Sequence, residues 1–344
     1  MPEEPTLKSL LKTRFRGTLM GGAIGDALGF PFEGSSRSFM VAVGDEVTQR
    51  YEKHRSGYFP RGQYSDDTQM TLATVEAIVE AGGIEGESIA ASFIPLWREN
   101  RIVGRGNACT EAVQRLMDGV ADWRTSGAEE GRAGNGAAMR IAPLGLWDYD
   151  QQERLGGHVE LVSRITHNDA RAVAGAAAVA AAVAYNVTHR EVILGDFLDF
   201  VSGVAQPFHE QMAKVIQDLP RLLSIPDQRA LEMISTFGFP GAYRESHDGI
   251  TPFVVSTVML ALYYFLRSPT NYEMTVRNCL LAGGDVDTTA GIAGSISGAL
   301  NGIDALPKKL VEGMQSRDRI LELADRFYNR KEQQRSRLPT QERP

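Results

Sequence analysis

Two short segments of the sequence have the same chemical character although they lie far apart. Each sets carboxylates and hydroxyls side by side, as Ser65-Asp66-Asp67-Thr68 and as Asp285-Val286-Asp287-Thr288. Such oxygen donors are hard ligands of the kind that Mg²⁺ or Mn²⁺ prefers, and neither segment offers the Cys/His spacing typical of zinc. If the clusters meet in the folded chain, they predict a site for two cations.

The same residue types are also common at the start of helices, which is the alternative interpretation. Ser and Asp are preferred N-caps, and Asp66 with Gln69 has the spacing of a capping box. A cap needs one acidic side chain, however, whereas each cluster has two together with a hydroxyl. The second cluster also follows Gly283-Gly284, a pair that allows backbone to approach a ligand closely. The two clusters together therefore favour a metal site.

Length and composition restrict the class of protein. The chain has 344 residues and a net charge of -7, which argues against a nucleic-acid-binding surface. Two cysteines make a disulfide scaffold improbable and fit a reducing cytoplasm. The apolar stretches 172–185 and 252–266 are shorter than the roughly 20 residues of a membrane span. We expect a cytoplasmic protein, monomeric and without a membrane segment.

Helical periodicity dominates the pattern of apolar residues, and few segments alternate like strands. The fold class expected is therefore all-α. An alanine-rich segment, 172–184, has almost no polar face and is expected to be buried. A polar tail is expected at 331–344. The helices predicted by period 3.6 are 70–81, 88–99, 108–117, 171–186, 191–201, 252–266, 272–281, 288–300 and 317–328.

Two glycine-rich segments add to the candidate site. The first, 21–33, is a helix candidate with Glu33 at its end, and the second is the loop Gly134-Asn135-Gly136 before Met139-Arg140. Such loops can hold a phosphate with backbone N–H groups, although a glycine loop alone is a weak signal that also fits a turn.

Taken in order, these motifs resemble the ADP-ribosylglycohydrolase family. The resemblance covers about 15–328 and rests on five short motifs in register, listed here: Gly25-Asp26-Ala27-Leu28-Gly29 with Glu33, Ser65-Asp66-Asp67-Thr68, Gly134-Asn135-Gly136 with Met139-Arg140, Thr166-His167, and Gly283-Gly284-Asp285-Val286-Asp287-Thr288-Thr289-Ala290. It implies a compact single-domain orthogonal bundle of helices, here 1–330, around a cleft for two Mg²⁺ or Mn²⁺ ions.

The resemblance also implies roles for residues. Glu33 matches an acidic residue beside the metals, and Asp26 is expected to be structural. The implied metal ligands are Ser65, Asp66, Asp67, Asp285, Asp287 and Thr288; the implied substrate contacts are Gly134, Asn135, Gly136, His167 and Tyr243.

The implied activity is a metal-dependent hydrolase that removes ADP-ribose from a modified acceptor. Water would attack C1″ of the distal ribose through an oxocarbenium-like species, with Glu33, Asp285 and Asp67 as candidates to assist it. The partner would be an ADP-ribosylated protein, first of all one modified on arginine, or a small ADP-ribose conjugate. Hydrolysis of O-linked ADP-ribose, on serine or in small molecules, is the alternative.

Two other classes also fit part of the pattern. Asp285-Val286-Asp287-Thr288 matches the DxDxT motif of aspartate-nucleophile phosphatases, but that motif follows a buried strand at the start of a domain, and here it follows two glycines near the chain's end. An inactive, crystallin-like or ADP-ribose-binding relative is the other class. Retention of all the implied metal ligands argues against it.

Overall fold

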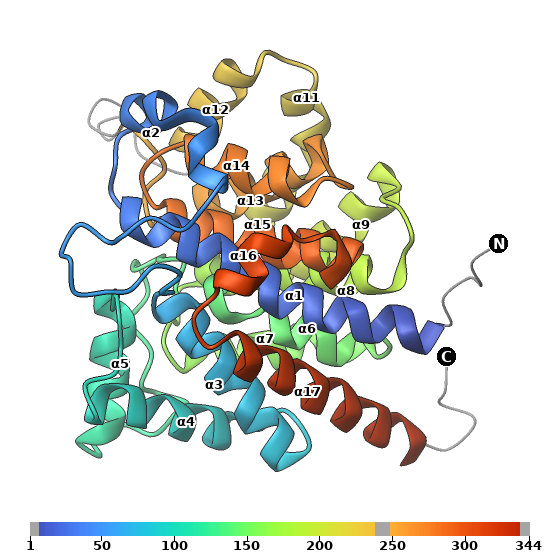
Figure 1. Ribbon diagram of the computed structural model, residues 1–344. Helices are drawn as coiled ribbons and strands as arrows, with labels where there is room; N and C mark the ends of the chain where they lie inside the picture. The colour runs from blue at the N-terminus through green and yellow to red at the C-terminus, as the bar shows by residue number, and fades with distance from the viewer. Residues whose placement is uncertain (1–6, 238–247, 338–344) are drawn as a thin grey trace.

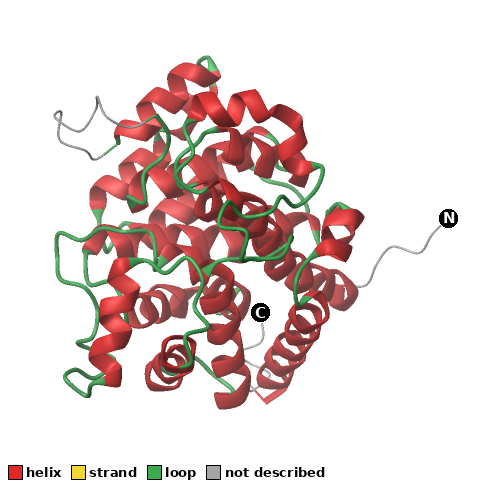
Figure 2. Cartoon of the chain, turned by 60° about the vertical axis from the view of Figure 1, so that its left-hand side comes forward, coloured by secondary structure: helices red, strands yellow, loops and turns green. Residues whose placement is uncertain are grey.

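The computed structural model describes residues 7–237 and 248–337, and all of the regular elements in these ranges are helical. Figure 2 shows helices joined by loops throughout this part of the chain. The all-α prediction is confirmed. The α-helices are α1 (Leu7–Gly29), α2 (Arg37–Val43), α3 (Asp66–Ala81), α4 (Gly86–Arg98), α5 (Asn107–Met117), α6 (Ala142–Asp148), α7 (Gln152–Arg164), α8 (Ala170–Thr188), α9 (Leu194–Ala205), α10 (Glu210–Gln217), α11 (Leu219–Leu223), α12 (Asp227–Thr236), α13 (Val254–Arg267), α14 (Tyr272–Leu281), α15 (Val286–Asn301), α16 (Lys308–Gly313) and α17 (Arg317–Arg337). Short 3-10 turns are η1 (Phe30–Phe32), η2 (Gly44–Thr48), η3 (Ala138–Arg140) and η5 (Ile303–Ala305).

Helices α1 and α15 pack against each other along their length, and α1 crosses the middle of the molecule in Figure 1. Their contact is made by glycines. A Cβ added to Gly25 would lie 2.1 Å from the Ala290 carbonyl oxygen, and one added to Gly17 would lie 2.5 Å from the Gly298 oxygen. The helices run antiparallel, because Gly29 meets Asp287 at the other end of the contact. This close packing brings the end of α1, and hence Glu33, to the start of α15.

Helix α8 is the alanine-rich core of the bundle. The side chains from Ala172 to Val187 are all buried, as the sequence predicts, and they are covered by α6, α7, α9, α13 and α15. By length and composition α8 could also cross a membrane. However, 89% of its most apolar window lies inside the protein, as in a core helix of a globular fold.

Most of the predicted helices are present with small shifts at their ends. The predicted helix at 272–281 matches α14, whereas the one at 191–201 begins three residues later, at Leu194. Helix α1 is much longer than the candidate at 21–33, since it begins at Leu7. Several short helices were not predicted, because segments such as α6 and α11 are too short to show a helical period.

The prediction of a polar tail from 331 is wrong for residues 331–337, which continue α17. Buried ion pairs hold this last part of the helix. Lys331 is fully buried and its Nζ lies 2.6 Å from Asp150 Oδ1, while Arg335 Nε lies 2.9 Å from Asp150 Oδ2. The polar residues therefore face an acidic partner that the sequence pattern does not reveal.

Candidate active site

One cavity of about 190 Å³ collects most of the predicted site residues. It lies between the starts of α3, α5 and α15, the loop before η3, and the segment that follows η1. The two acidic clusters do meet, as the pattern predicts. The predicted residues that line the cavity are Glu33, Asp66, Asp67, Gly134, Asn135, Gly136, His167, Asp285, Asp287 and Thr288.

The first acidic cluster is held by hydrogen bonds around Asp26 at the far end of α1. The fully buried Asp26 carboxylate accepts from the Ser65 N–H at 2.9 Å, the Thr68 N–H at 3.1 Å and the Thr68 hydroxyl at 2.6 Å. The structural role expected for Asp26 is thus confirmed. Since Asp26 satisfies these donors, the side chains of Asp66 and Asp67 remain directed into the cavity.

Ser65 acts as the helix cap of this cluster. It is the N-cap of α3, and its hydroxyl accepts from the Asp67 N–H at 3.2 Å. The capping box that the alternative interpretation offered for Asp66 and Gln69 does not form, because Ser65 is the N-cap. Gln69 instead donates to the Arg101 carbonyl at 2.8 Å and accepts from the Val103 N–H at 2.9 Å, so it holds the loop that follows α4.

The second acidic cluster is positioned by backbone. Gly283 and Gly284 have φ of +74° and +83°, and Gly284 exchanges hydrogen bonds with Gly34 and Ser35 at 2.8 and 2.7 Å. These bonds join the segment after Glu33 to the residue before Asp285. Asp285 is the N-cap of α15 without a side-chain cap bond, so capping does not account for its carboxylate.

The clusters influence each other electrostatically. Burial, followed by the charges of Asp26, Asp66 and Asp285, raises the pKa of Asp67 well above its usual range. Burial, then Asp285 and Asp67, does the same for the pKa of Asp287. Carboxylates crowded in a buried site disfavour one another's charge unless a cation compensates them.

The residues present fit a pair of hard cations. Asp67 Oδ2 and Asp287 Oδ1 are buried and have no hydrogen-bond partner among the residues that the structure describes, an arrangement that costs stability unless a ligand satisfies them. The donor set adds the Thr288 hydroxyl to carboxylates from both clusters. Within the described ranges, no three His, Cys, Asp or Glu side chains are arranged closely enough to form a cation cage by themselves. Hydroxyls and substrate oxygens would therefore have to complete the coordination.

Glu33 lies at the mouth of the cavity, directly after η1. Its carboxyl is the one most open to solvent in this group. Even so, the surrounding protein and then the Asp285 charge raise the pKa of Glu33, while Arg55 opposes that shift. A raised pKa makes this carboxyl a stronger proton acceptor, when ionised, than an ordinary carboxylate.

The Gly134–Gly136 loop lines the cavity, but its asparagine has a more specific contact than the sequence predicts. Asn135 Nδ2 donates to Asp285 Oδ2 at 2.5 Å and to Thr257 Oγ1 at 3.0 Å. The side chain of Asn135 therefore orients a carboxylate of the second cluster. Its backbone N–H donates to the Pro252 carbonyl at 3.0 Å, which fixes the loop against the start of α13.

His167 packs beneath the same loop. It is 1% exposed, and a Cβ added to Gly136 would lie 2.8 Å from its Cε1. Burial, followed by the charges of Arg140 and Arg132, lowers the pKa of His167 to about 3, so the ring is neutral. A neutral, buried ring shapes the cavity wall, and it is not a proton donor near neutral pH.

Sequence reasoning missed part of the cavity wall. Gly104 and Gly106, on the loop after α4, face the first cluster, and the Gly106 N–H donates to Asp66 Oδ2 at 3.2 Å. The closely spaced glycines at 104 and 106 were the available signal. Cys109, Met139 and Pro252 also line the cavity. Tyr243, predicted to flank the nucleotide, lies outside the described residues.

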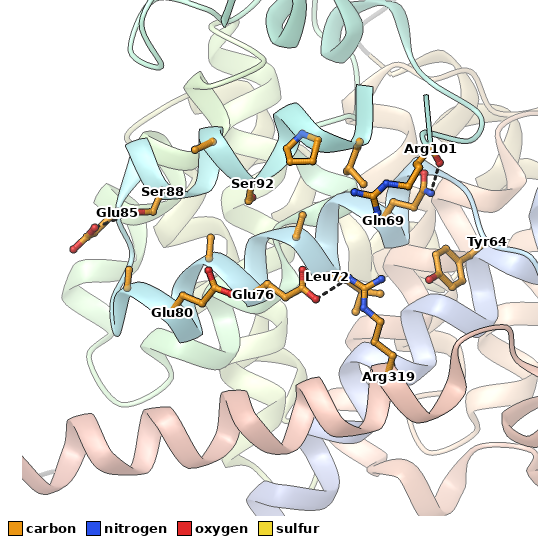
Figure 3. A pocket seen from close by; sticks show the side chains of 16 residues that line it. Tyr64, Gln69, Leu72, Glu76, Glu80, Glu85, Ser88, Ser92, Arg101 and Arg319 are labelled. Carbon is orange, nitrogen blue, oxygen red and sulfur yellow. Dashed lines mark hydrogen bonds and ion pairs between the residues drawn. The ribbon is translucent and has the colours of Figure 1, made fainter. Parts of the chain in front are cut away.

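A second hollow lies on the other side of Gln69. A groove of about 700 Å³ lies between α3 and α4. At one side of it, Oε1 of Glu76 on α3 lies 2.7 Å from Nη2 of Arg319 on α17, a pair that Figure 3 shows. The groove is lined by both acidic and basic side chains, and the predicted site residues lie outside it. The groove matters here because Gln69, at its end, fixes the loop that carries Gly104.

An all-helical bundle with an acidic cavity between two distant helix starts is the arrangement that the sequence resemblance implies. The chain belongs to the ADP-ribosylglycohydrolase family, whose family model matches residues 7–337. The predicted resemblance is thus confirmed across nearly the whole chain.

Named relatives agree with this assignment. The chain is 30% identical to an uncharacterized protein of Archaeoglobus fulgidus over 92% of this chain and 97% of that one. It is also 30% identical to the ADP-ribosyl-[dinitrogen reductase] glycohydrolase of Rhodospirillum rubrum, over 86% and 87% of the two chains. Identity to the ADP-ribosylarginine hydrolase Tri1 of Pseudomonas putida is 27%, over 92% and 78%. A solved ADP-ribosylglycohydrolase-related protein complex shares the fold, with a TM-score of 0.69, 22% identity and coverage of 93% and 99%.

Proposed function

We propose that this protein removes ADP-ribose from modified acceptors, and that its first substrate is protein carrying ADP-ribosyl-arginine. The convergence of both acidic clusters and Glu33 on one cavity carries the proposal. The name of one relative, which acts on dinitrogen reductase, supports a protein acceptor, and the name of another, an ADP-ribosylarginine hydrolase, supports arginine as the modified residue.

We further propose two Mg²⁺ or Mn²⁺ ions as cofactors, held by the residues that leave buried oxygens unpaired. Asp67 and Asp287 would hold them, joined by Asp66, Asp285 and the Thr288 hydroxyl. The family resemblance adds the Ser65 hydroxyl, which does not line the cavity and accepts from the Asp67 N–H. When bound, such cations polarise oxygen atoms and stabilise developing negative charge. The protein's own part is to fix these ligands before substrate arrives, which Asp26 does for the first cluster and Asn135 for the second.

Proton transfer falls to a carboxylate near C1″ of the distal ribose. Asp285 is tied to Asn135, and Asp67 is enclosed by other carboxylates, so Glu33 at the mouth is the freest of the three candidates. Glu33 takes a proton from the attacking water, and the bond from C1″ to the acceptor breaks with the proton passing to the leaving nitrogen. Glu33→Gln keeps the size of the side chain and should lower kcat by about 10²–10⁴-fold with ADP-ribose binding retained.

A panel of conjugates tests the function. Arginine-linked, serine-linked and small O-glycosidic ADP-ribose conjugates would be assayed with Mg²⁺, with Mn²⁺ and in excess EDTA. We expect turnover of the arginine-linked conjugate, dependent on the cation. Preference for a serine-linked conjugate would support the O-linked alternative, and no turnover of any conjugate would favour an inactive ADP-ribose-binding relative.

A further inference from the structure

Three exposed cations on the loops next to the cavity have no acidic partner within residues 7–237 and 248–337. They are Lys53 and Arg55 on the loop before α3, and Arg105 on the loop after α4; we call them the basic rim. Among the described residues, none of the three forms an ion pair or a side-chain hydrogen bond, although neighbouring arginines do. On these same two loops the paired residues are Arg50 and Arg61, both with Glu52, and Arg101 with Glu99.

The basic rim stands beside the candidate catalytic carboxylates. Arg55 follows His54, whose ring stacks on Phe30, and a Cβ added to Gly104 would lie 3.4 Å from Cε2 of the same Phe30, so the two loops meet beside the cavity. Arg105 lies between Gly104 and Gly106, which both line the cavity, and the Gly106 N–H binds Asp66. The rim thus lies next to the carboxylates that, in the proposed function, surround C1″ of the distal ribose. The acceptor leaves from this carbon.

The two loops hold the rim in place. The His54 ring stacks on Phe30 with centroids 4.5 Å apart, and Phe59 packs edge-on against both rings at 5.3 Å. Gln69 fixes the other loop through Arg101 and Val103, as Figure 3 shows for Arg101. Cations on anchored loops lose less conformational freedom when they bind a partner than cations on mobile ones.

The basic rim gathers three positive charges on two adjoining loops of a chain with a net charge of -7. We propose that the basic rim binds an acidic polypeptide segment next to the ADP-ribosylated side chain. This inference rests on the proposed function and narrows its substrate class to modified proteins with carboxylates near the modified residue. Charges at the edge of a contact act mainly on association and on its salt dependence.

An acidic polypeptide fits the rim better than a nucleic acid does. Binding of single strands needs several exposed aromatic faces along a basic groove, and this rim offers Tyr58, which is 89% exposed. The overall negative charge also opposes an extended polyanion. Three cations can pair with a few carboxylates of a polypeptide. Together, such exposed ion pairs should change kcat/KM by about tenfold at low salt.

The test reverses two rim charges and leaves Arg55 intact, because Arg55 acts on Glu33. Lys53→Glu with Arg105→Glu is compared with Arg229→Glu and Arg326→Glu, a matched pair of exposed residues on α12 and α17. The substrates are ADP-ribosyl-arginine peptides with Asp/Glu flanks or with Lys flanks, and free ADP-ribosyl-arginine. We expect the rim variant to lose about tenfold in kcat/KM on the acidic peptide, mainly through KM, with the loss vanishing in 0.5 M salt. The free conjugate should be unaffected.

An equal loss on the free conjugate would overturn the proposal, because the rim would then bind ADP-ribose itself. So would a response no larger than that of the control pair, or preference for an oligonucleotide-borne conjugate over the acidic peptide. Fluorescence anisotropy with the unmodified acidic peptide decides the question without turnover. If wild-type protein hydrolyses no conjugate, the proposed function fails. Equal binding of this unmodified peptide by wild type and by the rim variant would overturn the rim proposal, whether or not any conjugate is hydrolysed.

Discussion

The two acidic clusters have similar sequences, and each stands at the start of a 16-residue helix, but the protein supports them in different ways. The first, at α3, depends on polar side chains, because Asp26 and Ser65 satisfy the free N–H groups at the helix start. The second, at α15, depends on close backbone packing, with Gly284 and Gly29 touching neighbouring main chain. Similar ligands therefore require different supporting residues.

The difference follows from where each cluster lies. The start of α3 adjoins two long loops, so local hydrogen bonds must replace the packing that is missing there. The start of α15 lies against the end of α1 in the core, where main chain from two helices meets and no side chain fits. Removing a polar side chain should thus weaken the hydrogen bonds that hold the first cluster, and adding a side chain should disrupt the backbone packing that holds the second.

The largest effect should come from the ligands themselves, and it should be equal in both clusters. Asp67→Ala and Asp287→Ala each remove a buried carboxylate, one oxygen of which has no hydrogen-bond partner in the described part of the chain. Metal-assisted chemistry contributes several kcal/mol, so each variant should lose about 10³-fold or more in kcat. Turnover of ADP-ribosyl-arginine and circular dichroism would be measured together, with exposed Asp304→Ala as the control. Near-normal turnover in either variant would show that one cluster is dispensable.

A side chain added at a glycine should lower the free energy of unfolding more beside the second cluster than elsewhere. Gly284→Ala would place a Cβ 2.0 Å from the Ile250 carbonyl oxygen, at a φ of +83°. Strain and overlap together should cost about 3 kcal/mol of unfolding free energy or more.

Gly34→Ala is the matched control, because Gly34 has a similar φ of +75° and open space around its added Cβ. It should cost only about 1–2 kcal/mol, the price of the left-handed backbone alone. Denaturant titration of both variants measures the difference. Equal losses would mean that close packing does not support the second cluster.

The sequence predicts the fold class and the meeting of the clusters because both depend on strong local patterns. The helical period of Met70–Ala81 and the pair of acidic residues that begins at Asp285 can be recognised without knowledge of distant contacts. The partners of these residues are not visible. That Gln69 holds the loop at Arg101, or that Asn135 binds Asp285, depends on helices packed at positions that periodicity cannot specify.

The same limit explains the error at the end of the chain. Residues 331–337 look like a polar tail, yet Lys331 finds Asp150 far away in sequence. A polar composition indicates disorder only if no buried counter-charge exists. Similarly, the glycines of α1 are visible as a repeat, but only the structure shows that their partners are Ala290 and Gly298.

Cations should stabilise the fold by joining the two clusters. Without them, the buried carboxylates of both clusters repel one another at short range. A cation at a hundred times its Kd adds about 2.7 kcal/mol of unfolding free energy, so Mg²⁺ or Mn²⁺ should raise the Tm measurably. ADP-ribose should add a further rise only with the cation present. If ADP-ribose raised the Tm equally in excess EDTA, the sugar would bind without the cations, and the two clusters would not take part in its binding.

The smallest predicted effect isolates the support of the first cluster. Asp26→Asn keeps the shape of the side chain but replaces one oxygen that accepts from Thr68 with an amide that donates. Residues that orient metal ligands typically alter cation affinity by about 10–100-fold, so calorimetric titration with Mn²⁺ should show a loss of that size. Asn135→Ala is the counterpart in the second cluster. There the backbone hydrogen bonds of Gly284 and Asp285 remain to hold the site, so this variant should lose Mn²⁺ affinity by nearer the lower of the two factors. If Asn135→Ala weakens Mn²⁺ binding more than Asp26→Asn does, the second cluster also depends on side-chain hydrogen bonds, and the two supports are alike.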